Sequence, residues 1–427
     1  MKPSFGAVKN WASEVLRSDS AAVSVSIGCV QGVPIGALLL CSLVAAPGLL
    51  GAIRWLESTM ALALIVISLG LPSLSLRSAA MDGSRKNVLS LLVNGSIAGV
   101  ISTAVVGAAL FLLLDRIEPP AGAVSNFWTG LLVVCTLLAA QCSRLALAIL
   151  QGTRSLRAVL TNMAPIAILS MVLLPALSAC FGAFGWVLGR ALFEAALMLV
   201  LCSAVVHQEA MAVALKSVSG SEIASMLKAG LSVNYSITLR AVADNLPLIM
   251  LGFVSKDSGA LGVFGFANLL LFLPLFHISV LSQSALPSLV RAANGDEGLS
   301  LKTCLDSLSR RLRLCVVFWG VLLLVVAALL HYELVLKEYE ASAFLIAILV
   351  VSLPGRVVIL QAGALNVATG SYGRSALMAA SEIAVITFLF AVIESPSAVF
   401  AAAVVVASLV PSLLYGKHIL NGARQRA

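Results

Sequence analysis

Two pairs of oppositely charged residues lie inside apolar stretches of the chain, where charges are rare. Arg190 and Glu194 form one pair, and Arg240 and Asp244 form the other. The members of each pair are four positions apart, so both side chains lie on one face of a helix. A charge at the centre of a membrane span costs roughly 2.5–3.5 kcal/mol and usually marks a substrate or ion pathway. The alternative, which stays open, is that each pair only neutralises itself.

Further polar residues lie in neighbouring apolar stretches. Arg144 lies near one end of its stretch, where its charge can reach the membrane surface while its stem stays in lipid. His277 is alone on an apolar segment, and we expect it to be a packing residue. The remaining members of this set are Gln141, Asn245, Arg356, Gln361 and Glu382.

The composition predicts a membrane protein with many spans. Hydrophobic residues make up 60% of the 427 residues and charged residues 11%, against roughly 45–50% and about 25% in soluble domains. So few charges cannot cover an aqueous surface. The eight cysteines show no C-x-x-C spacing and no histidine spacing that would suggest a metal site, so we expect no disulfide framework, metal or cofactor.

A membrane-spanning helix needs about 20 apolar residues. The sequence contains twelve such stretches, which predict an all-α polytopic protein with twelve transmembrane helices. They are 22–46, 55–76, 88–114, 127–151, 157–181, 183–206, 231–254, 262–286, 314–331, 343–367, 375–393 and 396–416.

Basic residues predict the orientation of these spans. With the N-terminus inside, the cytoplasmic segments hold 19 Lys and Arg residues and the opposite side holds 4, among them Arg54. This asymmetry follows the positive-inside rule and places both termini in the cytoplasm. The net charge of +8 is spread over short segments, so we expect no nucleic-acid binding.

A repeated motif indicates two related halves. The sequence LPSL at 71–74 returns at 286–289, each time followed by a basic residue and by Ala-Ala. Glycines match as well, in PGLLGAI (47–53) and SGALGVF (258–264). We therefore expect LPSL to end equivalent helices of two six-helix bundles in a parallel internal repeat. The predicted divisions are a bundle at 1–206, a cytoplasmic connection at 207–230 and a second bundle at 231–427.

Three stretches carry a resemblance to a known superfamily. They are LLGAIRWLESTMALALIVISLGLPSLSLRSAA, RAVADNLPLIMLGFVSKDSGALGVFGFANLLLFLPLFHISVLSQSALPSLVRAAN and ILQAGALNVATGSYGRSALMAA. These resemble the second-helix region, the seventh and eighth helices, and the junction of the tenth and eleventh helices of bacterial polysaccharide flippases. The chain is thus similar to the O-antigen and exopolysaccharide branch of the multidrug/oligosaccharidyl-lipid/polysaccharide (MOP) exporter superfamily, which has a MATE-like fold.

The resemblance implies a transporter and no enzyme. Its substrate would be a prenyl-pyrophosphate-linked oligosaccharide, flipped across the bacterial inner membrane by alternating access for O-antigen (lipopolysaccharide), capsule or exopolysaccharide synthesis. Membrane lipids, a polysaccharide polymerase and glycosyltransferases would be its partners.

Specific residues suit this task. Arginine forks bind phosphate oxygens in pairs, and amides bind sugars, so the expected substrate-binding residues are Arg190, Arg240, Arg356, Asn245 and Gln361, with Asn234 and Tyr235 as further candidates. Asp244 and Glu194 are expected to couple transport to H⁺ or Na⁺ by releasing their arginine partners.

Three alternatives remain. A cation-coupled multidrug antiporter of the same superfamily would need carboxylates facing its substrate, whereas the first predicted span holds no acidic residue. A major facilitator would carry an ordered motif in the loop that here reads RSAAMDGSRKN. A membrane glycan polymerase or ligase would need a larger outward loop than the sequence provides.

Overall fold

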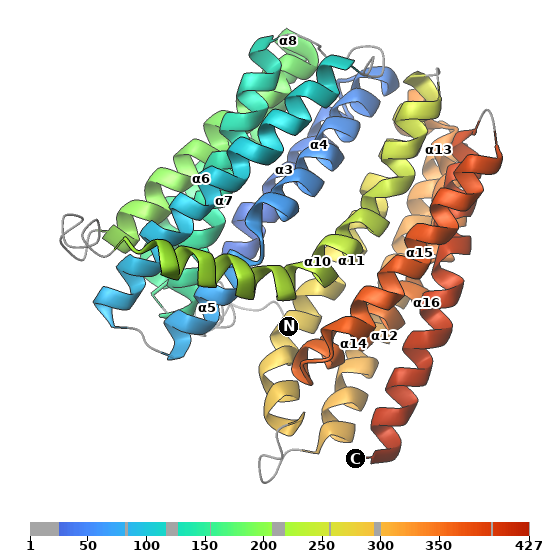
Figure 1. The fold of residues 1–427 in the computed structure, drawn as a ribbon. Coiled ribbons are helices and arrows are strands. Elements are labelled where there is room, and N and C mark those ends of the chain that lie inside the picture. Colours follow the sequence, from blue (N-terminus) through green and yellow to red (C-terminus); the bar gives the residue numbers. More distant parts are fainter. Residues whose placement is uncertain are drawn as a thin grey trace, which may run out of the picture. The chain divides into compact units, whose positions relative to one another are not determined.

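A computed structural model of the chain describes residues 25–81, 84–116, 127–153, 155–206, 218–255, 258–293, 300–393 and 396–426. All regular elements in these ranges are helices, which confirms the predicted all-α fold class (Figure 1). The helices are α3 (Val33–Cys41), α4 (Pro47–Ser68), α5 (Leu71–Met81), α6 (Arg85–Arg116), α7 (Phe127–Gly152), α8 (Arg157–Val206), α10 (Gly220–Val254), α11 (Ser258–Ala293), α12 (Leu301–His331), α13 (Ser342–Val350), α14 (Leu353–Ala368), α15 (Tyr372–Val392) and α16 (Ala398–Arg426), with a π-helical turn η1 (Gly28–Gly32) and a 3₁₀ turn η2 (Lys337–Tyr339).

Most of these helices can span a membrane. Within the described ranges, nine are long and apolar enough to do so by themselves. The pair α13 and α14 makes another span that bends by 47°, and Val25–Cys41 is a shorter apolar helix. The chain is therefore a multi-pass membrane protein.

Helix α8 accounts for two predicted spans at once. Its apolar part, Val159–Val206, has 48 residues, which at 1.5 Å per residue exceeds twice the ~30 Å hydrocarbon thickness. The helical path breaks at Gly182, whose φ of 61° and ψ of −143° are open only to glycine. Past the break the chain turns back on itself, since a Cβ on Gly185 would lie 1.9 Å from the Leu177 carbonyl oxygen. The predicted boundary between 181 and 183 is confirmed.

The prediction that the repeated LPSL motif ends equivalent helices was wrong for the first half, whereas in the second half the motif lies within the last two turns of α11. The predicted span 55–76 breaks at Leu69 and Gly70, which both have positive φ (45° and 70°). LPSL then begins α5, where Pro72 suits the first turn because the N–H it lacks has no helical partner there. In the second half, Pro287 lies inside the continuous α11, as membrane helices allow.

The chain forms two compact units. Unit 1 comprises 1–40, 63–117 and 125–234, and unit 2 comprises 41–62, 118–124 and 235–427. Residues 41–62 of the predicted first bundle thus pack within unit 2. The predicted division at 206 and 231 stays a prediction. The two units are defined by which residues contact one another, whereas the predicted bundles are defined by the internal repeat.

Unit 1 is built around α7, which packs against α5, α6 and α8. The first part of α10 belongs to this unit and is tied to it by polar contacts. Asn94 of α6 donates to Glu222 at 2.9 Å, and the amide of Asn234 donates to the carbonyl oxygen of Ile65 at 3.2 Å. At their crossing, a Cβ on Gly230 would meet the Leu69 carbonyl oxygen at 2.0 Å.

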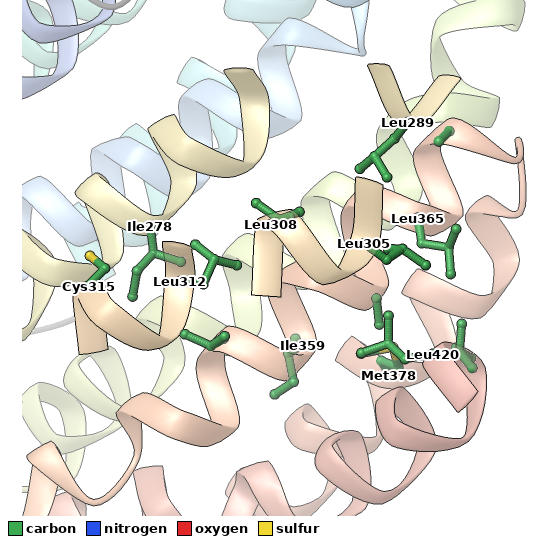
Figure 2. Packing of buried hydrophobic residues seen from close by; sticks show 14 of the residues in the cluster. Ile278, Leu289, Leu305, Leu308, Leu312, Cys315, Ile359, Leu365, Met378 and Leu420 are labelled. Carbon is green, nitrogen blue, oxygen red and sulfur yellow. The ribbon is translucent and has the colours of Figure 1, made fainter. Parts of the chain in front are cut away.

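Unit 2 packs α11 against α12, α13 and α14, and packs α16 against α14 and α15. One apolar cluster joins α11, α12, α14, α15 and α16, and Figure 2 shows its members Ile278, Leu308, Ile359 and Leu420 among others. The beginning of α4 also belongs to unit 2. There the hydroxyl of Tyr339, from the turn η2, donates to the Ala45 carbonyl oxygen at 2.8 Å just before α4 begins.

The two glycines that the sequence pairs as repeat equivalents lie against each other in unit 2. A Cβ on Gly51 would lie 2.6 Å from the backbone nitrogen of Gly262, and a Cβ on Gly262 would lie 1.8 Å from the Pro47 carbonyl oxygen. The backbones of α4 and α11 therefore touch, a packing mode that membrane helices achieve through small residues.

This contact predicts a large effect of one methyl group. Gly262→Ala should lower the thermal stability of the purified protein by about 1–3 kcal/mol, because backbone must move to admit it. Gly363→Ala is the matched control, since its Cβ would meet nothing within 4 Å, and it should leave stability equal or higher. Equal melting temperatures for the two variants would contradict the backbone contact.

Candidate functional site

Arg240 is the centre of an ion-pair network in unit 2. Its Nε and NH2 donate to the two carboxylate oxygens of Asp244 at 3.1 and 2.5 Å, one turn along α10. Its NH1 and NH2 donate to the two oxygens of Glu382 on α15 at 2.7 and 2.8 Å. The guanidinium thus makes a fork-to-fork contact with two carboxylates, the strongest geometry that arginine offers.

Asp244 is shared between two arginines. Its Oδ1 also accepts from NH1 of Arg356, which reaches it from α14. The side chain of Asp244 is 30% exposed and that of Arg240 is 23% exposed, whereas Arg356 is 7% exposed and Glu382 is fully buried. The network therefore has an accessible side, formed by Arg240 and Asp244, and a sealed side.

The network carries two positive and two negative charges, so it is neutral as it stands. Its members come from α10, α14 and α15, and the sequence predicts a binding or coupling role for three of them, Arg240, Asp244 and Arg356. Removing one charge would leave its partner buried without compensation, which costs about 3–5 kcal/mol. Protonation of Asp244 would instead leave a net charge of +1 with two arginine forks beside it.

The other two candidates of this unit make separate contacts. The amide nitrogen of Asn245 donates to the Ala241 carbonyl oxygen at 2.9 Å within α10. That of Gln361 donates to the hydroxyl of Ser309 at 2.6 Å and joins α14 to α12. Gln361 is 5% exposed, so its amide is engaged in packing. A role in substrate binding stays a prediction for both.

Arg190 and Glu194 form a second ion pair, in unit 1. Their side chains meet at 3.1 Å on α8 and are 8% and 2% exposed. The hydroxyl of Ser143, on α7, donates to the other oxygen of Glu194 at 3.3 Å, and the guanidinium of Arg190 lies 5.6 Å from the ring centre of Phe193. This pair is more deeply buried than the accessible side of the unit 2 network.

Sequence reasoning assigned no role to one central residue and misplaced another. Glu382 was noted only as a charge within a span, although it completes the network. Arg54 was counted in an outward segment, but it lies inside α4 and is 6% exposed, three residues from the buried Glu57. Its guanidinium lies 5.3 Å from the ring centre of Phe272 on α11. The i,i+3 spacing of Arg54 and Glu57 places both on one face of α4 and could have signalled two further charges within a span.

Comparisons by sequence identify no relative. No known family profile matches the chain, and no curated protein matches it.

Solved structures, in contrast, match nearly the whole chain. An inward-facing multidrug resistance MATE family transporter of the MOP superfamily has a TM-score of 0.71 at 14% identity, covering 94% of this chain and 98% of its own. The chain has the MATE fold. An outward-facing transporter of the same kind has a TM-score of 0.65 at 14% identity, covering 97% and 99%.

A third match concerns the polarity of the binding pocket. A MOP superfamily transporter from Pyrococcus furiosus has a TM-score of 0.66 at 14% identity and covers 97% of both chains. That protein is described as having a binding pocket of reversed polarity that suggests a different function. At this identity the matches establish the fold, and they favour it over the major facilitator alternative.

The network predicts that a neutral double variant will be more stable than a charged single one. Arg240→Gln leaves the buried Glu382 without its main partner and should destabilise the protein by about 3–5 kcal/mol. Adding Glu382→Gln removes the orphaned charge and should recover most of the loss. Thermal unfolding in detergent measures both. Additive destabilisation in the double variant would show that the two residues are not coupled.

Proposed function

We propose that the chain is an alternating-access transporter that flips a prenyl-pyrophosphate-linked oligosaccharide across the bacterial inner membrane. The MATE fold supports transport, since the matched structures include inward-facing and outward-facing transporters. The observation that carries the choice of substrate is the sharing of one partly exposed carboxylate, Asp244, by the two guanidiniums of Arg240 and Arg356.

This arrangement suits an anion better than a cation. An organic cation would have to displace two arginines from Asp244, and it would face both positive charges after doing so. A pyrophosphate, in contrast, offers several oxygens that can take the place of the carboxylate on both forks. The prenyl tail stays in lipid while the charged head uses this polar side of unit 2.

Asp244 provides a means of coupling. When it takes up a proton or binds Na⁺, its hold on the two arginines weakens, and the net positive charge of the network favours the anionic head. Loss of the ion restores the neutral network and expels the head. In unit 1, the pair Arg190 and Glu194 has the same make-up and would respond to ions in the same way, with Ser143 holding Glu194 in place.

The cation antiporter remains the second candidate, because two of the matched structures are multidrug resistance transporters. The transporter from Pyrococcus furiosus, with its pocket of reversed polarity, supports a change of substrate on this fold. Capsule, exopolysaccharide or O-antigen synthesis is the setting we propose for the flippase, with glycosyltransferases supplying the lipid-linked substrate and a polymerase consuming it.

The test is translocation of a fluorescent prenyl-pyrophosphate-linked oligosaccharide in proteoliposomes under an imposed H⁺ or Na⁺ gradient. Asp244→Asn should lose the dependence on the gradient. The double variant Arg240→Gln with Glu382→Gln should lower the rate by about 10- to 100-fold, the value of a charge-assisted contact of roughly 1.5–3 kcal/mol. Lys337→Ala removes a charge from an exposed ion pair of the same i,i+4 spacing and should leave the rate unchanged.

Two outcomes would contradict the proposal. Native-like rates in the network variants would show that the ion pairs only neutralise one another and have no role in transport. Transport of an organic cation without any movement of the lipid-linked sugar would assign the chain to the drug antiporters.

A further inference from the structure

A cavity of about 530 Å³ opens at one end of unit 2, away from the charged network. It lies where α11 and α14 end, where α12 and α15 begin, and beside the last turns of α16. Its volume is in the range of ligand sites, roughly 300–1,000 Å³. The orientation expected from the basic residues places this end of the unit at the cytoplasmic face of the membrane.

One wall of the cavity is unusually positive. It contains the N-termini of two long helices, at Ser300 before α12 and at Ser371 before α15. Neither serine caps its helix with its side chain, and neither helix has an acidic residue in its first turn. Unpaired N–H groups and the helix dipole make such ends attractive to anions.

Basic side chains add to this potential where helices normally place acids. Arg374 lines the cavity from the first turn of α15, and Lys302 is exposed in the first turn of α12. A cation at a helix N-terminus opposes the dipole. In the part of the chain that the structure describes, no carboxylate forms an ion pair with Arg374. Among the described residues, the wall therefore holds positive charge that no carboxylate pairs with.

An independent observation at the same place points to a ligand. Asn366 lines the cavity and is 1% exposed. Its amide nitrogen donates to the hydroxyl of Ser375 at 3.1 Å, but its Oδ1 has no hydrogen-bond partner among the described residues. A buried acceptor without a donor costs about 1–3 kcal/mol. A ligand that carries a hydroxyl as well as a negative charge could donate to Asn366 and pair with the positive groups of the cavity.

Part of the cavity lining is apolar. Leu301, Leu365 and Ile419 line it, and Leu365 and Ile419 also belong to the apolar cluster of unit 2, where Figure 2 shows Leu365. A free phosphate has no apolar group that could contact these residues. A phospholipid, in contrast, can place its glycerol and upper acyl chain against them. Anionic lipids are also concentrated at the cytoplasmic leaflet.

We propose that this cavity binds the phosphate and hydroxyls of an anionic phospholipid headgroup. The phosphate lies between the N-termini of α12 and α15 and pairs with Arg374, a headgroup hydroxyl donates to Asn366, and the glycerol contacts the apolar part of the lining. The site is separate from the charged network of α10, α14 and α15. We therefore expect the lipid to bind there regardless of which substrate that network binds.

The test is native mass spectrometry of the full chain in detergent, titrated with phosphatidylglycerol or with zwitterionic phosphatidylcholine. The native protein should bind phosphatidylglycerol at least ten-fold more tightly. Arg374→Ala should remove most of this preference. Ser371→Asp should remove it too, because its carboxylate occupies the anion position, while Asp is a good N-cap and keeps α15 folded. A melting temperature no lower than native separates lost binding from lost folding.

The matched control is Arg310→Ala, which removes an exposed arginine of α12 outside the cavity lining and should leave the preference unchanged. An equal loss in Arg310→Ala, or no loss in Arg374→Ala, would overturn the site. A parallel titration with inorganic phosphate, followed by thermal shift, distinguishes the source of the anion. Phosphate binding that depends on Arg374, without a preference for phosphatidylglycerol, would overturn the lipid as occupant and leave a soluble phosphate in its place.

Discussion

The fully buried carboxylate of Glu382 is the constraint on which the rest of unit 2 depends. A lone charge at this position would be prohibitive in a low-dielectric interior, so an arginine must stand beside it. Arg240, on α10, pairs with Glu382 and also with Asp244. Asp244 in turn pairs with Arg356, so the four residues form one network. These ion pairs hold the helices α10, α14 and α15 in a fixed register. Apolar packing alone would allow one helix to slide slightly along another.

Close backbone contacts provide the second kind of constraint. In lipid, apolar side chains gain little from leaving their surroundings, so helices associate through tight packing of small residues. The contact of Gly51 with Gly262 in unit 2 and that of Gly185 with Leu177 in unit 1 both follow this rule. Charge fixes which helices of unit 2 meet, and glycine fixes how closely they approach.

Much of this could be predicted from the sequence, because span length, charge asymmetry and i,i+4 spacing are local properties. The all-helical fold, the break at Gly182 and the pairing of Arg240 with Asp244 all follow from such patterns. The failures concern what local patterns do not contain. LPSL suits the first turn of a helix as well as its last, and only the positive φ of Leu69 and Gly70 shows which applies. Glu382 is 142 positions from Arg240, a separation that no spacing rule connects.

The division of α4 between the units has a consequence for biogenesis. Residues 41–62 belong to unit 2, most of which is synthesised more than 170 positions later, from Tyr235 onward. Arg54 and Glu57 must therefore enter the membrane long before Phe272 and the rest of α11 leave the ribosome. During that interval the growing chain holds two charges on a helix whose final neighbours do not yet exist. Unit 2 is thus completed late, when residues 41–62 pack against helices of the C-terminal half.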